Sequence, residues 1–95
     1  MKIGRVVGTV VATQKDKSFE GFKFLIIQPG TSNRKGARKD NIVAVDTVGA
    51  GIGECILYCK GRASRFAAKK QDSAIDAAVV AIIDNIDYQD KNEGD

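Results

Sequence analysis

Two carboxylates flank a glycine-rich segment near the middle of the chain. Asp46 precedes this segment and Glu54 follows it, with Gly49, Gly51 and Gly53 between them. Paired carboxylates can carry general acid–base catalysis, and glycine-rich loops can bind phosphate groups through backbone N–H groups. The plainer interpretation is that the carboxylates cap turns or form ion pairs.

The glycine-rich segment lacks the neighbours that phosphate-binding loops require. A Walker loop continues with Lys and then Ser or Thr, whereas Glu54 follows Gly53 here, and its charge would repel a phosphate. A dinucleotide-binding loop opens a helix, but the β-branched and aromatic run 54–60 indicates a strand. We therefore expect a tight connection with glycine-specific backbone angles, whose bare backbone lets neighbouring subunits approach closely.

The chain contains no histidine, which removes the most common general base and metal ligand. Its two cysteines, Cys55 and Cys59, would lie about 13 Å apart on one face of a strand, too far for a disulfide. Two thiolates alone make a poor zinc site, so we expect small buried hydrophobic side chains. The sequence predicts no catalytic residue, metal site or cofactor, and an enzyme that uses Asp46 and Glu54 ranks last among the hypotheses.

A nucleic-acid-binding protein is the alternative function. Four basic side chains that could meet phosphates share one polar segment: Arg34, Lys35, Arg38 and Lys39. Such a protein also needs exposed aromatic rings for base stacking. Phe22 and Phe24 share one face of a predicted strand, where a core pair is the plainer interpretation.

Short runs of Val, Ile and Phe, separated by turn residues, must position these groups. The first four strands that we predict span residues 3–13, 22–28, 42–46 and 54–60. We predict a short helix over residues 61–69, then a helical turn at 73–77 and a last strand to about Tyr88. This pattern predicts a mainly all-β fold, a small five-stranded OB-like barrel with one short helix. Gly4 and Gly8 on the first strand would allow a bend or a close backbone approach.

The length of 95 residues corresponds to one domain, which we assign to residues 1–88. Five acidic side chains and one lysine lie in residues 84–95, and we expect 89–95 to be an acidic, disordered tail. No apolar run approaches the roughly 20 residues that span a bilayer. The first residues follow a strand-like pattern rather than that of a signal peptide, so we expect a cytoplasmic protein.

Several segments resemble the EutN/CcmL family of bacterial microcompartment vertex proteins. The resemblance begins with residues 1–13 and continues through 25–29 and 43–54. The segment Gly61–Arg65 is similar to the family's Gly-Ser-Ser-Ala-Arg stretch, and residues 76–84 are similar to its closing strand. The block Ala-Val-Asp-Thr-Val-Gly-Ala-Gly, with Gly-Glu following, is the most specific part of the resemblance.

The resemblance implies a structural shell protein rather than an enzyme. Its barrel would assemble into a homopentamer, or a hexamer as in occasional family members, that caps the vertices of a polyhedral microcompartment shell. The implied partners are further copies of the chain and hexagonal shell proteins, without nucleic acid, membrane or cofactor. Subunit contacts and the rim of a central channel are expected at Gly49, Ala50, Gly51, Gly53, Glu54, Ser64 and Arg65. Arg62 and Ala63 replace the family's small polar pair, which would change the charge of such a channel.

Overall fold

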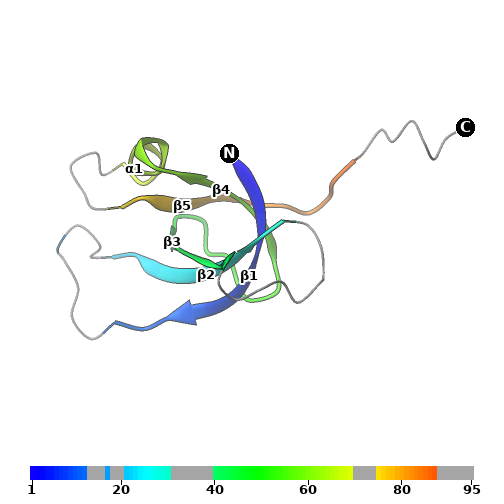
Figure 1. The fold of residues 1–95 in the computed structure, drawn as a ribbon, viewed down its shortest axis with the longest axis horizontal. Helices are drawn as coiled ribbons and strands as arrows, with labels where there is room; N and C mark the ends of the chain where they lie inside the picture. The colour runs from blue at the N-terminus through cyan, green and yellow to red at the C-terminus, as the bar shows by residue number, and fades with distance from the viewer. Residues whose placement is uncertain (13–16, 18–20, 31–39, 70–74, 88–95) are drawn as a thin grey trace, which may run out of the picture.

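The computed structural model describes residues 1–12, 17, 21–30, 40–69 and 75–87. These residues form a closed barrel with one short helix at its side (Figure 1). The elements, in chain order, are β1 (Lys2–Val10), β2 (Lys23–Pro29), β3 (Ile42–Asp46), β4 (Cys55–Lys60), α1 (Arg62–Ala67) and β5 (Ala77–Ile82). The strand order around the barrel is β1-β2-β3-β5-β4, which confirms the predicted all-β, five-stranded barrel.

Strand β1 closes the barrel because it pairs with two neighbours. Its first residues pair antiparallel with β4, and the stretch from Gly4 to Val10 pairs antiparallel with β2. A register shift between Val6 and Gly8 marks an irregularity in the ladder between β1 and β2, and such bulges bend a strand as a small barrel requires. Strands β2–β3 and β4–β5 are also antiparallel, whereas β3 and β5 are parallel and pair only at Val45–Ala78 and Asp46–Val79.

Gly4 permits the close approach that the sequence predicts for it. A Cβ atom added at this position would lie 2.6 Å from Cγ2 of Ile27 and 3.1 Å from Cε1 of Tyr58. Both neighbours are core side chains, so any larger residue at position 4 would push into the barrel interior. Gly8 is less confined, because its added Cβ would first meet Cδ1 of Ile26 at 3.2 Å.

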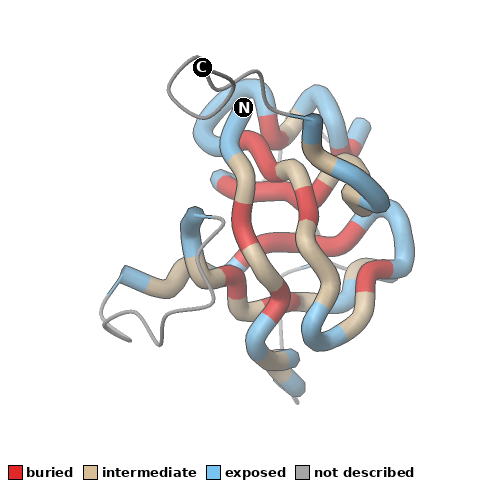
Figure 2. Tube along the Cα trace, turned by 90° about the vertical axis from the view of Figure 1, so that its right-hand side faces the viewer, coloured by how far each residue is buried: buried red, intermediate tan, exposed pale blue. Residues whose placement is uncertain are grey.

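Two apolar clusters hold the fold together. Figure 2 shows that the buried positions lie mainly along the strands of the barrel. The inner cluster comprises Val6, Leu25, Ile27, Ala44, Ala50, Ile56, Tyr58, Ala77 and Val79. The outer cluster comprises Val45, Cys59, Ala68, Ile75 and Ala78, with Phe22, Phe24 and Val80 packed against it. The two phenylalanines therefore contribute to packing, as expected, and Phe66 of α1 remains half-exposed.

The two cysteines behave differently although both lie on β4. Cys59 is buried and Cys55 is partly exposed, and neither forms a disulfide. Burial raises the pKa of the Cys59 thiol, which favours the inert, protonated form. The expectation of a small buried hydrophobic side chain is thus confirmed for Cys59 and only partly for Cys55.

The structure differs from the prediction in the segment after α1. The predicted helical turn at 73–77 is wrong for its described part, because Ile75 and Asp76 are irregular and Ala77 already begins β5. Ala77 and Ala78 pair with Lys60 and Cys59 of β4, so tertiary pairing decides the conformation of the alanine-rich run. The strand also ends at Ile82, before the predicted Tyr88. Tyr88 and the acidic segment 89–95 lie outside the described residues.

Candidate functional site

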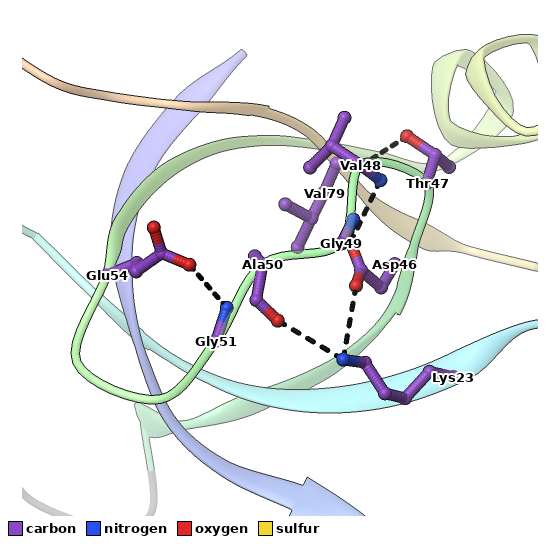
Figure 3. Close-up of polar contacts among 9 residues, drawn as sticks. All are labelled: Lys23, Asp46, Thr47, Val48, Gly49, Ala50, Gly51, Glu54 and Val79. Atoms are coloured by element: carbon purple, nitrogen blue, oxygen red, sulfur yellow. Dashed lines mark hydrogen bonds and ion pairs between the residues drawn. The ribbon is translucent and has the colours of Figure 1, made fainter.

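The loop 47–54 between β3 and β4 contains Gly49, Ala50, Gly51, Gly53 and Glu54, the glycine-rich part of the predicted site. Figure 3 shows how side chains from the surrounding strands hold its backbone. Oδ1 of Asp46 accepts hydrogen bonds from the backbone N–H groups of Val48 and Gly49, each at 3.0 Å. Asp46 is therefore a turn cap, as the plainer interpretation predicted.

Glu54 caps the other end of the same loop. Its Oε1 atom accepts a hydrogen bond from the backbone N–H of Gly51 at 2.6 Å. Its backbone carbonyl accepts from the N–H of Val6 at 3.0 Å, and the carbonyl of Val6 accepts from Gly53 at 2.8 Å. The loop is thereby fixed against β1.

Two of the glycines adopt backbone angles that other residues avoid. Gly49 has a φ of 80° and Gly53 a φ of 92°, both in the left-handed region that favours glycine. The expected tight connection is confirmed, with one glycine in each of its two turns. The carboxylates of Asp46 and Glu54 accept hydrogen bonds from backbone N–H groups within these turns and so fix the backbone there.

Two cations support the loop, although the sequence pattern predicts no role for either. Nη1 of Arg5 donates to the carbonyl of Gly53 at 2.7 Å. Nζ of Lys23 donates to the carbonyl of Ala50 at 3.3 Å and lies 3.7 Å from Oδ2 of Asp46. Both contacts depend on which residues face each other across the barrel, and the sequence pattern does not give that register.

Thr47 fastens the loop to β5. Its Oγ1 donates to the carbonyl of Val79 at 2.7 Å, and its backbone N–H donates to the same oxygen at 3.3 Å. These bonds prolong the short pairing between β3 and β5 by one residue. Side-chain and backbone hydrogen bonds thus attach the loop to four strands, β1, β2, β3 and β5, within a single chain.

Two large side chains of this loop, Val48 and Ile52, are apolar and exposed. Ile52 is 66% exposed and Val48 is 39% exposed, whereas Ala50 is completely buried and anchors the loop in the inner cluster. The carboxylates of Asp46 and Glu54 both accept backbone hydrogen bonds. A fixed loop with apolar side chains facing solvent suits contact with another protein surface better than acid–base chemistry.

The other two predicted site residues, Ser64 and Arg65, lie on α1. The loop precedes β4 and α1 follows it, so the two parts of the predicted site lie at opposite ends of this strand within one chain. Ser64 is completely buried, and its hydroxyl bonds to the carbonyl of Gly61 and lies 3.4 Å from that of Ile75. Arg65 is partly exposed. The guanidinium of Arg62 lies 5.6 Å from the centre of the exposed Phe66 ring, a cation–π contact on the helix surface.

The described residues give little support to a metal site or to a nucleic-acid-binding surface. They contain no group of three or more His, Cys, Asp or Glu side chains that could hold a metal ion. The phenylalanines that could have stacked on bases, Phe22 and Phe24, pack against the outer cluster. The basic residues Arg34, Lys35, Arg38 and Lys39 lie outside the described residues. No helix in the described parts of the chain is long and apolar enough to cross a bilayer.

Comparisons with known proteins point to one family along almost the whole chain. Residues 1–84 match the model of the family described as ethanolamine utilisation protein EutN/carboxysome. The chain is 42% identical to the carboxysome shell vertex protein CcmL of Nostoc sp. (strain PCC 7120), over 96% of this chain and 90% of that protein.

Solved structures show the same fold. The barrel is similar to an ethanolamine utilization protein EutN, with a TM-score of 0.83 and 31% identity over 93% of this chain and 91% of that one. It is also similar to GrpN, a pentameric microcompartment shell protein from Rhodospirillum rubrum, with a TM-score of 0.73 and 39% identity over 93% and 100% of the two chains.

Proposed function

This chain belongs to the EutN/CcmL family, and on that premise we propose that it is a structural component of a bacterial microcompartment shell. In this role it forms a homopentamer that caps the vertices of the polyhedral shell. The observation that carries the proposal is the 42% identity to a carboxysome shell vertex protein over nearly the full length of both chains. The GrpN structure adds a pentameric relative with the same fold.

A vertex unit has a geometric task that the barrel suits. A flat sheet of hexagonal tiles cannot close into a polyhedron, so five-fold units must occupy its corners. A ring of identical chains requires a head-to-tail contact whose rotation closes. The barrel is closed, which removes the free strand edges that would promote open-ended sheet growth. Association then depends on loops and side chains, whose arrangement can fix the number of copies.

We place the subunit contacts and the rim of the central channel at Gly49, Ala50, Gly51, Gly53, Glu54, Ser64 and Arg65. Of these, Ala50 and Ser64 are buried within the protomer and would act by fixing the local shape. Gly49 and Gly53 are exposed, as is Ile52 between them. The loop and α1 lie at opposite ends of β4, so a head-to-tail ring can bring the loop of one protomer toward the helix of the next.

The same assignment predicts a cationic rim. Arg62 is exposed and Arg65 is partly exposed on α1, so five copies would place ten guanidinium groups around the ring.

In this proposal the chain has no catalytic role. Asp46 and Glu54 support this, because both carboxylates hold the backbone of the loop. Residues 1–88 would form the vertex domain and 89–95 an acidic tail.

Native mass spectrometry of the purified chain tests the ring. We expect a discrete species of five times the 10.2 kDa chain mass, and a species of six times that mass would indicate the hexameric form. A strictly monomeric chain at high concentration would contradict the proposal.

Co-production with hexagonal shell proteins tests the position in the shell. Electron microscopy should reveal closed polyhedra when the chain is present and open sheets, tubes or uncapped shells when it is omitted. A matched control replaces the wild-type chain with a variant that folds but does not form rings. Closed, capped polyhedra in the absence of the chain would rule out the vertex role.

A further inference from the structure

A pocket opens between β3 and β5 because the two strands pair at only two positions. Its volume is about 140 Å³, close to the roughly 150 Å³ of apolar protein cavities that hold a benzene-sized group. Asp76 is the one charged residue in its wall. The other lining residues are apolar: Phe24, Val43, Ala44, Val45, Ile75 and Ala77. Val43 at this site is 51% exposed, so the pocket leaves apolar surface in contact with solvent.

The segment that follows β5 leaves the barrel. Residues 83–87, called the C-terminal arm here, begin with the N–H of Ile83 donating to the carbonyl of Cys55 at 2.8 Å. Beyond that bond, residues 84–87 belong to no strand or helix. Figure 1 shows the arm, in orange, extending past β1 on the side away from α1. Its apolar side chain Ile86 stands between the exposed residues Asn85 and Asp87.

A protomer's own arm runs away from the wall of the pocket formed by Ile75, Asp76 and Ala77. Strand β5 separates the two, and from Ala77 to Ile82 it spans about 16 Å at the usual rise per residue. The four residues from Ile82 to Ile86 extend at most about 14 Å. Even fully extended back along β5, the arm would bring the backbone of Ile86 no further than the first residues of that strand, and Figure 1 shows the arm running in the opposite direction.

We propose that Ile86 of one protomer inserts into the β3/β5 pocket of the next protomer in the ring. The proposal rests on the homopentamer proposed above and assigns it a specific contact. Arm and pocket lie at opposite ends of β5, which is the arrangement that a head-to-tail contact requires. The match to the family model covers residues 1–84, so Ile86 lies two residues beyond it.

Cysteine cross-linking within the assembled ring tests this contact. The test chain carries V43C and I86C together with C55S, and it retains Cys59, whose thiol is buried with a raised pKa. A short bismaleimide should join position 43 of one chain to position 86 of the next and give a ladder of linked protomers, with the linked peptides identified by mass spectrometry. The control chain, V11C/I86C/C55S, carries its cysteine at the 90% exposed Val11 and should give no ladder.

The outcomes separate this inference from the proposed function. A native mass spectrum with five chains per particle, together with no linkage between positions 43 and 86 or equal linkage in the control, would overturn the arm contact and leave the ring intact. A wild-type chain that remains monomeric would overturn both. As a second measure, Ile86→Asp should raise the protein concentration at which rings dissociate by about tenfold or more, whereas Asp87→Asn should change it little. Equal effects of the two substitutions would also contradict the proposal.

Discussion

Lys23 and Asp46 face each other directly across β2 and β3, with Nζ and Oδ2 3.7 Å apart. Their exposure differs sharply, because 54% of the Lys23 side chain but only 3% of the Asp46 side chain is accessible to solvent. The ion pair is therefore partly screened and contributes little on its own. The buried carboxylate matters more because it also accepts two backbone N–H groups of the loop.

Asp46→Ala should destabilise the protomer much more than Lys23→Met. The alanine variant leaves the N–H groups of Val48 and Gly49 without their carboxylate acceptor, which should lower the free energy of unfolding by about 2–3 kcal/mol. The methionine variant removes a half-exposed cation and should cost less than about 1 kcal/mol. Urea denaturation of both variants gives the comparison, and equal losses would show that the ion pair, rather than the turn cap, stabilises the loop.

Gly4→Ala should destabilise the barrel, whereas Gly8→Ala should be better tolerated. The new methyl group at position 4 would lie 2.6 Å from Cγ2 of Ile27, and both atoms belong to a packed interior that cannot easily shift. Overpacking of this kind costs about 1–3 kcal/mol. At position 8 the first contact is the terminal Cδ1 of Ile26 at 3.2 Å, which can rotate. Thermal unfolding of the two variants checks the order, and a larger loss at position 8 would contradict it.

Ile52→Asp should disrupt the ring without unfolding the protomer. Ile52 is 66% exposed in the single chain, so the substitution should change its free energy of unfolding by no more than about 0.5 kcal/mol. In the proposed interface the new carboxylate would lose water without gaining a partner. Native mass spectrometry should then detect monomers at concentrations where the wild type forms rings.

Val11→Asp is the matched control for this loop variant. Val11 is 90% exposed and lies well beyond Arg5 and Val6, the residues of β1 that bond to the loop. The same charge placed there should leave the rings intact. Rings in the Ile52→Asp variant, or their loss in both variants, would remove the loop from the interface.

Alkaline pH should destabilise the fold partly through Cys59 and Tyr58. Burial raises the pKa of both side chains above their ordinary values. The unfolded chain then releases these protons at a lower pH than the folded chain, so stability is intact below the ordinary pKa values and falls as the pH rises through the raised ones. The decline should begin above about pH 8.5, where a free cysteine titrates.

Cys59→Ala isolates the contribution of the thiol to this decline. The cavity that the substitution leaves costs the same at each pH, so only the titration differs between the variant and the wild type. Urea denaturation at pH 7 and pH 9.5 should therefore reveal a smaller loss in the variant. Parallel losses in the two proteins would show that Cys59 does not contribute.

The barrel was predictable because its strands carry strong local signals. The run from Ile42 to Asp46 is short, apolar and bounded by turn residues, and the structure gives it the predicted limits. Where the signal is ambiguous, tertiary pairing decides: the alanines at 77 and 78 could have joined a helical turn, but their backbone pairs with β4. Periodicity alone does not contain that information.

The site was predictable in its turn chemistry and not in its cross-strand contacts. Asp46, Gly49 and Glu54 act through residues two or three positions away in the chain, and such local bonds can be read from a sequence. Arg5 reaches Gly53 over 48 positions and Lys23 reaches Ala50 over 27. Those contacts depend on strand order and register, which appear only once the barrel is closed.

The two-position parallel ladder between β3 and β5 also determines where the barrel opens locally. Amide protons of a protein exchange with deuterium first where few hydrogen bonds must break together, and this seam is the weakest ladder in the described barrel. Native-state exchange should therefore begin at β3 and at the first residues of β5, while the long β1–β2 ladder stays protected. A neighbouring protomer bound at this seam would suppress its local opening, so that assembly of the shell would also stabilise each vertex protomer.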